Sequence, residues 1–333
     1  MAKGDLRKEL FRLLTGEREQ FHSGQELCEQ LGVSRTAVWK EVNRLREQGY
    51  AIQSVTNRGY RLTGLPDLLT DDLLALHLSQ RREPVFCYDE VDSTNTRLLQ
   101  MALSGAANGT VVLADRQTRG SGRLGRSFAS PGGSGVYLSY LLRPECDTER
   151  LSLLTSYAGL AVCEVLEEYG LAPAIKWPND IIINRRKVCG ILTKLTGDAE
   201  TATVNGAVIG IGVNVTQRRE DFPEELQDKA ISVREAGAIV PRAELAAKII
   251  ERLDRFFFEE KLLCCPAGPV IERLRQRSCT VGSRVTVIAP TESREADAID
   301  IAPDAGLVIR YDDGTVTTVN SGEVSVRGLL GYT

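Results

Sequence analysis

The feature that most constrains this chain is a stretch rich in glycine and arginine, Gln117-Thr-Arg-Gly-Ser-Gly-Arg-Leu-Gly-Arg126. It follows an apolar run at 110–114 that is typical of a buried strand, and a second apolar run at 136–142 predicts another strand. Its glycines allow the backbone to approach a ligand closely, and its arginines supply fixed positive charge. A loop of this composition between two strands suits an anionic ligand, above all a phosphate.

Three interpretations of this stretch compete. Gly120-x-Gly122-x-x-Gly125 matches the dinucleotide fingerprint as a pattern, but that fingerprint needs a helix to open inside it. Here Ser127-Phe-Ala-Ser-Pro131 follows, which counts against a helix, and the chain lacks a P-loop sequence. A phosphate-binding loop and a solvated surface hairpin with incidental arginines therefore remain.

Composition limits the class of protein. With 333 residues, of which 42% are hydrophobic and 26% charged, we expect a soluble, cytoplasmic protein of two or three domains. No apolar run approaches the ~20 residues of a membrane span, and the first residues lack a signal-peptide core. Eight cysteines without a C-x-x-C pair and only two histidines favour reduced thiols over a zinc site.

The first 64 residues predict a winged helix-turn-helix domain. Leucines at helical spacing predict a helix over 5–15, and capping serines predict two more over 24–31 and 35–48. Alternating residues around Asn57-Arg58-Gly59 then predict a hairpin. Residues 1–64 carry eleven Lys and Arg against eight Asp and Glu, although the whole chain has a net charge of −4. A basic head on an acidic body favours a polyanionic partner.

A winged helix uses its third helix to read the major groove, while its wing lies near phosphate. The alternative is that this domain serves protein interaction or dimerisation. The candidates for DNA contact are Arg35, Thr36, Trp39, Lys40, Asn43 and Arg44 on the helix and Arg58 on the hairpin.

The remaining chain predicts an α/β (α+β) mixed-sheet domain over 81–276, after a linker with a short helix at 65–80. Strands are expected over 85–89, 110–114, 136–142, 174–183, 187–194 and 203–215, and helices over 96–104, 150–170 and 242–259. From 277 to 333 the sequence predicts short strands only, which is typical of a small SH3-like β barrel.

Five motifs occur in an order that resembles the biotin protein ligase family. They are Asp92-Ser-Thr-Asn95, Gln117 to Arg126, Lys176-Trp-Pro-Asn-Asp180, Lys187-Val-Cys-Gly-Ile-Leu192 and Gly210-Ile-Gly-Val-Asn214. With the winged helix before them and the barrel after them, nearly the whole chain resembles the bifunctional bacterial type, which also represses the biotin operon.

The resemblance implies an activity, substrates and partners. Biotin would be activated by ATP with Mg²⁺ as biotinyl-5′-adenylate and then transferred to a lysine of a biotin carboxyl carrier protein. The adenylate would also act as corepressor, so that a homodimer binds operator DNA and represses genes of biotin synthesis and transport. Two other interpretations stay open: a biotin-sensing transcription factor without catalysis, and lipoate attachment on a related fold.

The resemblance also implies site residues. Attack of a carboxylate on a phosphate brings two anions together, so cations must surround the reacting atoms, and the catalytic candidates are Arg123 and Lys176. The candidates for binding biotin are Ser93, Thr94, Asn95, Gln117, Ser121, Gly122, Arg123 and Lys176. The candidates for binding ATP or the adenylate are Arg119, Gly120, Arg126, Lys187 and Asn214, and no protein ligand is assigned to Mg²⁺.

Several expectations concern single positions. Loop 117–130 would fold over the adenylate and exclude water. Two positions depart from the family pattern. Family members often carry Arg or Lys where this chain has Ser121, and many carry Glu where it has Lys194. Trp177 is expected to pack in the interior in preference to stacking on adenine, and Asp180 either orients its loop or helps to hold a metal ion.

Overall fold

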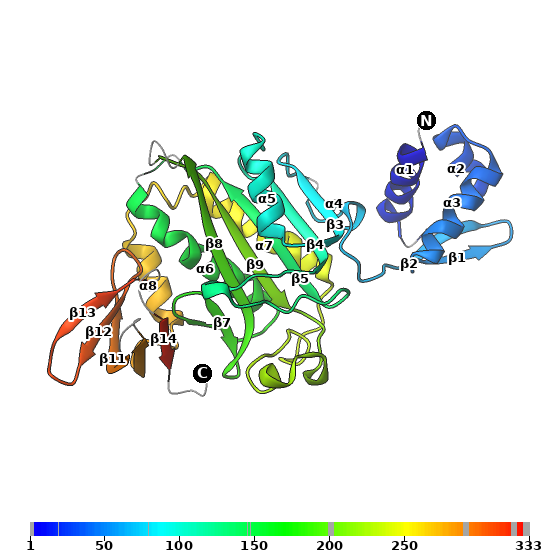
Figure 1. Cartoon of the computed structure of the whole chain (residues 1–333). Helices are drawn as coiled ribbons and strands as arrows, with labels where there is room; N and C mark the ends of the chain where they lie inside the picture. Colours follow the sequence, from blue (N-terminus) through cyan, green and yellow to red (C-terminus); the bar gives the residue numbers. More distant parts are fainter. Residues whose placement is uncertain are drawn as a thin grey trace. The chain divides into compact units, whose positions relative to one another are not determined.

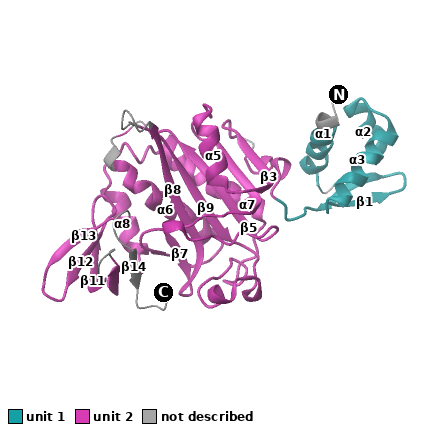
Figure 2. Ribbon diagram, in the orientation of Figure 1, with its two compact units in different colours: residues 1–68 teal, residues 69–333 magenta. Residues whose placement is uncertain are grey.

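The computed structural model describes residues 3–18, 20–78, 80–144, 146, 148–198, 203–288, 293–320 and 325–328. The chain divides into two compact units, residues 1–68 and 69–333 (Figure 2). Within the described ranges, no helix is long and apolar enough to cross a membrane.

Unit 1 has the predicted winged helix-turn-helix fold (Figure 1). Ser23 Oγ accepts a hydrogen bond from Glu26 N at 3.1 Å, and Ser34 Oγ accepts one from Ala37 N at 3.3 Å, so both serines cap helices as expected. The three helices are α1 (Lys3–Gly16), α2 (Gly24–Leu31) and α3 (Arg35–Glu47). The antiparallel hairpin of β1 (Ala51–Val55) and β2 (Gly59–Gly64) forms the wing.

Unit 2 is built on a mixed sheet of seven strands in the order β3-β4-β5-β9-β8-β7-β6 (Figure 1). Only β3 and β4 are parallel, because α5 (Thr94–Leu103) connects them as a crossover, and every other neighbouring pair is antiparallel. The strands are β3 (Val85–Val91), β4 (Val111–Gln117), β5 (Gly135–Leu142), β6 (Ala174–Lys176), β7 (Asp180–Ile183), β8 (Arg186–Asp198) and β9 (Thr203–Asn214).

Helices cover both faces of this sheet. Along β5, Leu141 packs with α5, whereas Tyr140 donates a hydrogen bond to Asp254 at the end of α7 (Arg242–Asp254). Consecutive residues of a strand point to opposite faces, so α5 and α7 lie on opposite sides. The helix α6 (Leu154–Glu168) packs against α7 and the sheet.

Several predicted boundaries change. The helix expected over 150–170 begins as a 3₁₀ turn (Thr148–Leu153), and the one expected over 242–259 ends in a π turn (Arg255–Glu259). The linker helix is only α4 (Asp71–Ala75), which packs against β3 and α7 inside unit 2. The helix α8 (Gly268–Arg277) was not predicted from the sequence.

The last part of unit 2 is a small antiparallel β structure in the order β13-β12-β11-β10-β14, as expected for the SH3-like barrel. Its strands are β10 (Arg284–Ile288), β11 (Ser293–Ile301), β12 (Leu307–Tyr311), β13 (Val316–Val319) and β14 (Ser325–Gly328), the last of which was not predicted. Residues 289–292, 321–324 and 329–333 of the predicted barrel lie outside the described residues.

Candidate active site between two adjoining cavities

Two cavities adjoin on the α5 face of the large sheet. The larger, of about 480 Å³, lies between the 122–129 segment, the turn after β6 and the 222–230 segment. The narrower one, of about 60 Å³, lies over the sheet beside the start of α5. Both are lined by Gly122, Arg123, Phe128, Asn179 and Lys187, so these residues form a shared wall.

The narrow cavity is lined by neutral polar side chains. Thr94 donates hydrogen bonds from its N and Oγ1 atoms to Gln117 Oε1, at 2.9 and 3.2 Å. The hydroxyl of Ser139 is fully buried beneath it, 2.8 Å from Thr94 Oγ1 and 2.6 Å from Asn95 Oδ1. Ser93 occupies the position just before α5, and its hydroxyl makes no capping hydrogen bond to that helix. This arrangement suits a flat, neutral ligand rich in donors and acceptors.

Glycines on β8 and β9 form the floor of this cavity. A Cβ atom at Gly210 would lie 2.4 Å from Asn95 Oδ1, and one at Gly212 would lie 2.6 Å from the Phe128 ring. These separations are far below van der Waals contact, so only glycine permits the approach. The Phe128 ring therefore lies directly on the sheet, in the wall between the cavities.

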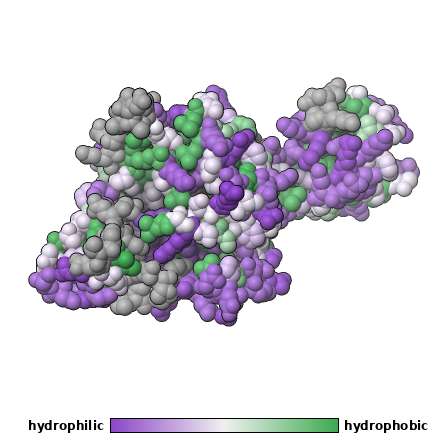
Figure 3. All heavy atoms as spheres, in the orientation of Figure 1, coloured by the Kyte–Doolittle hydropathy of each residue, from purple (hydrophilic) through white to green (hydrophobic). Residues whose placement is uncertain are grey.

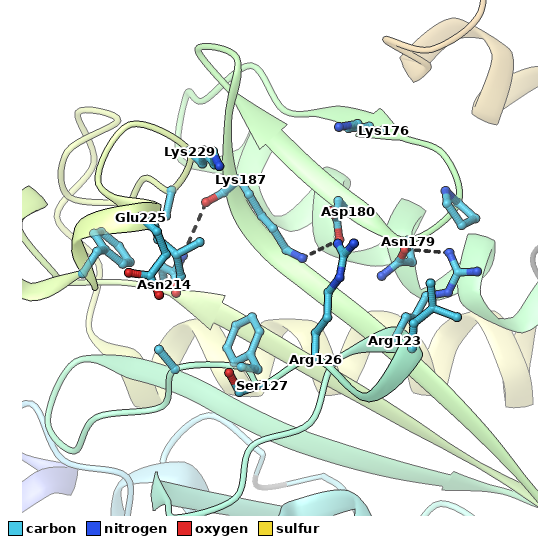
Figure 4. Close-up of a pocket in the computed structure, with 18 of the residues that line it drawn as sticks. Arg123, Arg126, Ser127, Lys176, Asn179, Asp180, Lys187, Asn214, Glu225 and Lys229 are labelled. Atoms are coloured by element: carbon cyan, nitrogen blue, oxygen red, sulfur yellow. Dashed lines mark hydrogen bonds and ion pairs between the residues drawn. The ribbon is translucent and has the colours of Figure 1, made fainter. Parts of the chain in front are cut away.

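The larger cavity is lined by five cationic side chains (Figure 4). They belong to Arg123, Arg126, Lys176, Lys187 and Lys229. Asp180 and Glu225 are its carboxylates. An excess of fixed positive charge in a concave site suits a polyphosphate.

One ion pair and one hydrogen bond hold side chains of the shared wall in place (Figure 4). Lys187 Nζ lies 2.6 Å from Asp180 Oδ1, and Arg123 Nη1 donates to Asn179 Oδ1 at 3.2 Å. Burial lowers the pKa of Arg123, and Arg126 lowers it further, while Asp180 opposes both. An arginine retains its proton under such conditions, so the wall carries a permanent positive charge.

The arginine-bearing segment forms a compact hairpin. Gly122 N donates to Arg126 O at 2.7 Å, and Phe128 N donates to Gly120 O at 2.8 Å. Between them Leu124 has φ 56° in a 3₁₀ turn, and its side chain is 71% exposed. A left-handed, non-glycine residue at a loop tip is uncommon and stores a small conformational cost.

Most of the predicted site residues line one cavity or both. The narrow cavity is lined by Ser93, Thr94, Asn95, Gln117, Ser121, Gly122 and Arg123, and the larger one by Arg123, Arg126, Lys176, Lys187 and Asn214. Lys176 reaches only the larger cavity, whereas Lys187 lines both. Arg119 and Gly120 line neither of these two cavities.

One wall of the site was not predicted from the sequence. The segment 222–230 supplies Phe222, Glu225, Leu226, Lys229 and Ala230 to the larger cavity. Apolar residues four apart, at 222, 226 and 230, were the available signal. It was weak because 3₁₀ turns (Arg219–Asp221 and Glu224–Leu226) interrupt any regular period. Ser139 was also missed, because a lone serine in an apolar strand carries no motif.

Asn214 and Trp177 contact neighbouring parts of the protein itself, Asn214 through hydrogen bonds and Trp177 through packing. Asn214 Nδ2 donates to Lys187 O at 3.4 Å and to Ile231 O at 3.3 Å, which ties the end of β9 to neighbouring backbone. Trp177 is 6% exposed and packs in the barrel core, as expected, and it also lines the larger cavity.

Protein side chains alone do not form a metal cage here. In the part of the chain that the structure describes, no group of three or more His, Cys, Asp or Glu side chains is placed to hold a metal ion. A magnesium ion bound mainly by phosphates needs only one or two carboxylates, and Asp180 and Glu225 lie in the larger cavity.

The proposed DNA-contacting residues lie on the outer surface of unit 1, which is largely hydrophilic on the face seen in Figure 3. Trp39 is 53% exposed, and Asn43 is half-buried. Arg44 donates to the buried Glu41 at 2.8 Å. On the wing, the Arg58 guanidinium lies 4.4 Å from the centre of the Phe21 ring, a cation–π contact.

Three family descriptions match successive parts of the chain. The biotin/lipoate A/B protein ligase family matches residues 88–214, an HTH domain matches 7–61, and the biotin protein ligase C-terminal domain matches 280–327. Their order agrees with the winged helix, the mixed sheet and the small barrel.

Individual relatives cover most of the chain. The bifunctional ligase/repressor BirA of Escherichia coli is 32% identical over 313 residues, which span 92% of this chain and 94% of that protein. The protein of the same name from Bacillus subtilis is 39% identical over 252 residues, 74% of this chain and 77% of that protein. Among solved structures, biotin protein ligase from Aquifex aeolicus in complex with biotin and ATP is 31% identical, with a TM-score of 0.63, over 74% of this chain and all of that one.

Proposed function

This chain belongs to the family of bifunctional biotin ligases and repressors, and from that premise we propose how its two cavities divide the work. Biotin binds in the narrow cavity and ATP in the larger one. The product, biotinyl-5′-adenylate, spans the shared wall until a lysine of a biotin carboxyl carrier protein accepts the biotin.

This proposal rests on one observation, namely that the two cavities lie side by side and share a wall. A ureido ring is neutral and calls for hydroxyl and amide partners, which Thr94 and Gln117 supply. A triphosphate calls for cations, which gather in the larger cavity. Since the Phe128 ring lies on Gly212 in the wall, we expect this ring to shift when biotin enters.

In the first step a carboxylate oxygen of biotin attacks the α-phosphorus of ATP, and pyrophosphate leaves. The anionic groups meet at the wall, where Arg123 and Lys187 supply positive charge. Lys187 fits this position better than Lys176 does, because only Lys187 lines both cavities. Its Nζ lies 3.0 Å from the place of a Cβ on Gly190 in the floor. We therefore assign Lys176 to the phosphates and Lys187 to the reacting carboxyl group.

In the second step the neutral amine of the carrier lysine attacks the carboxyl carbon of the adenylate. AMP leaves, and the amine gives up a proton as the amide forms. The adenylate is a labile mixed anhydride, so water must be kept away until then. Segments 122–129 and 222–230 both line the larger cavity and are the candidates for this cover.

Magnesium fits this scheme as part of the nucleotide. Mg²⁺ commonly keeps several waters and binds phosphate oxygens with one or two carboxylates. Asp180 and Glu225 are the carboxylates that could complete such a shell, and the metal would neutralise phosphate charge.

A labelling experiment tests the ligase proposal. The protein is incubated with biotin, Mg·ATP and an apo biotin carboxyl carrier domain, and the carrier is probed with avidin. We expect labelling that needs ATP and the carrier lysine. Absence of labelling despite measurable biotin binding would instead indicate a biotin sensor without catalysis.

Arg123 has a separate predicted role in retaining the adenylate. Replacement by glycine removes a cation from the wall and frees the hairpin from Asn179. We expect Arg123→Gly to release adenylate early and to label bystander lysines on added albumin. Retention of the adenylate in this variant would rule out the clamp role.

For repression we propose a cytoplasmic homodimer that binds a two-fold operator through paired winged helices. The contacts would come from Arg35, Thr36, Trp39, Lys40, Asn43 and Arg44 of α3 and from Arg58 of the wing. Biotin plus ATP should raise operator affinity and dimer population together, as measured by gel shift and sedimentation. Equal operator affinity with and without these ligands would remove the regulatory half of the proposal.

A further inference from the structure

We propose that the C-terminal barrel acts in adenylation by holding Trp177, so that Trp177 is a positioning residue for the segment 176–180. This inference rests on the proposed ligase function and adds a role for the barrel to it. Its basis is a chain of contacts that runs from the barrel core to both cationic groups of the shared wall.

On the barrel side, Trp177 is fixed by its ring and by both of its N–H groups. Its backbone N donates to Thr280 Oγ1 at 2.9 Å, and its Nε1 donates to Ala305 O at 2.8 Å. Trp177 belongs to one buried hydrophobic cluster with seven barrel residues: Val285, Val287, Ala296, Ala298, Leu307, Ile309 and Val319. A residue held in this way cannot move without disturbing the barrel core.

The preceding strand is joined to the same region. Cys279 N donates to Ile175 O at 3.0 Å, just before the barrel begins. The barrel is in turn docked on the sheet domain through Arg275 of α8, whose Nε lies 2.6 Å from Asp300 of β11, and through Ser152 Oγ, which donates to Asp304 O at 3.0 Å. These contacts make the barrel a fixed support for Trp177.

On the cavity side, the two residues that follow Pro178 hold the wall. Asn179 Oδ1 accepts the hydrogen bond from Arg123, and Asn179 is joined to Ile191 by two hydrogen bonds of 2.9 and 3.0 Å. Asp180 is paired with Lys187. In the sequence, Trp177 therefore stands two residues before Asn179 and three before Asp180, the partners of the two cations in the shared wall.

The physical reason for such a support is the weakness of the local structure. The strand β6 has only three residues and lies at the edge of the sheet, where it pairs with β7 and is joined to it by the turn of residues 177–179. A short edge strand is a poor anchor by itself. Displacement of catalytic groups by 1 Å can lower a rate about 100-fold, so an anchor outside the cavity has a direct effect on chemistry.

Variants at Thr280 test the coupling without altering any residue that lines the cavities. Thr280→Val removes the oxygen that accepts the Trp177 N–H, and Thr280→Ser retains it as the matched control. We measure adenylation by pyrophosphate release and biotin binding by calorimetry. We expect adenylation to fall about tenfold in Thr280→Val and to stay near the wild-type rate in Thr280→Ser. Biotin affinity should fall less than adenylation does in Thr280→Val, because Asn179 is the one residue of segment 176–180 that lines the narrow cavity, beside Thr94 and Gln117.

Variants at Trp177 give the larger effect, and because Trp177 also lines the larger cavity they are interpreted together with the Thr280 pair, which leaves that lining unchanged. Trp177→Phe keeps a ring in the barrel and loses one hydrogen bond, whereas Trp177→Leu loses the ring. We expect adenylation to fall modestly in the first and about 100-fold in the second. If circular dichroism shows that Trp177→Leu does not fold, the adenylation rates of the two Thr280 variants and of Trp177→Phe test the inference.

Tryptophan fluorescence gives a readout of the coupling itself. The chain has two tryptophans, and Trp39 is exposed whereas Trp177 is buried, so emission resistant to iodide belongs to Trp177. We expect Thr280→Val to increase the fraction that iodide quenches. Wild-type adenylation in Trp177→Leu, or equal rates in Thr280→Val and Thr280→Ser, would overturn the inference. Absence of pyrophosphate release from the wild type would instead overturn the proposed function.

Discussion

Lys187 and Lys176 stand eleven positions apart in the sequence, and the structure gives them different surroundings. Lys187 is paired with Asp180 at 2.6 Å in the wall that both cavities share. Lys176 is the last residue of the edge strand β6, and it lines the larger cavity but not the narrow one. The sequence motifs do not tell the two lysines apart, whereas the fold places Lys187 between the two cavities and Lys176 beside the larger one.

This difference predicts how alanine variants behave. We expect Lys187→Ala to lower the adenylation rate constant by about 100-fold or more, because it removes charge where charge develops in the transition state. Lys176→Ala should mainly raise the KM for ATP. Pyrophosphate release over a range of ATP concentrations separates the two effects. Similar rate constants in Lys187→Ala and wild type, with a large loss in Lys176→Ala, would restore the original assignment.

Tyr137 predicts a dependence of stability on alkaline pH. Burial raises the pKa of Tyr137 from 10.0 to about 12, and its hydroxyl donates to Pro131 O at 3.0 Å. As pH rises from 10 toward 12, the unfolded chain releases this proton and the folded chain keeps it, so the free energy of unfolding falls.

In Tyr137→Phe, the fall in the free energy of unfolding that comes from this hydroxyl at alkaline pH should disappear. The slope of unfolding free energy against pH between 10 and 12 becomes shallower by up to about 1.4 kcal/mol per pH unit. At neutral pH the variant should be less stable by about 1 kcal/mol, because one hydrogen bond is lost. Urea titrations at several pH values provide the measurement, and parallel curves for the two proteins would contradict the prediction.

At the scale of elements, caps and periodic apolar residues made the helices of unit 1 predictable. Ser34 caps α3, the helix assigned to DNA reading. We expect Ser34→Ala to destabilise unit 1 by about 1 kcal/mol, because Ala37 N loses its partner. Ser34→Asp keeps an acceptor and is the control. Urea unfolding followed by circular dichroism measures both, and equal losses would show that the cap contributes nothing.

Elements without a regular period were missed or shortened. The π turn after α7 and the 3₁₀ turn before α6 depart from the period of 3.6 on which helix prediction depends. The segment 222–230 belongs to the same class, and so one wall of the larger cavity escaped notice. Strands of the sheet were recognisable because their apolar runs are short, dense and separated by turn residues.

At the scale of the whole molecule, division into two units predicts two unfolding events. Both proposed ligand cavities lie in residues 69–333, so ligands should stabilise that unit alone. Biotin at 100 times its dissociation constant should add about 2.7 kcal/mol to the unfolding free energy of unit 2. Differential scanning calorimetry should show one transition that moves and one that does not.

Lipoate in place of biotin is the control for this experiment. It should leave both transitions in place, since the neutral partners in the narrow cavity suit a ureido ring. A shift with lipoate would favour the alternative substrate. A single transition that moves as a whole with biotin would show that the two units unfold together.

The sequence by itself determined the three-part organisation, the winged helix, the mixed sheet and four of the five cationic residues that line the larger cavity: Arg123, Arg126, Lys176 and Lys187. Caps, periodicity and motif order are local properties, so they can be recognised without coordinates. Tertiary structure decided which lysine stands in the shared wall, that segment 222–230 lines the larger cavity, and that Trp177 enters the barrel core. Each of these depends on residues far apart in the sequence being packed together, and packing is a property of the folded chain as a whole.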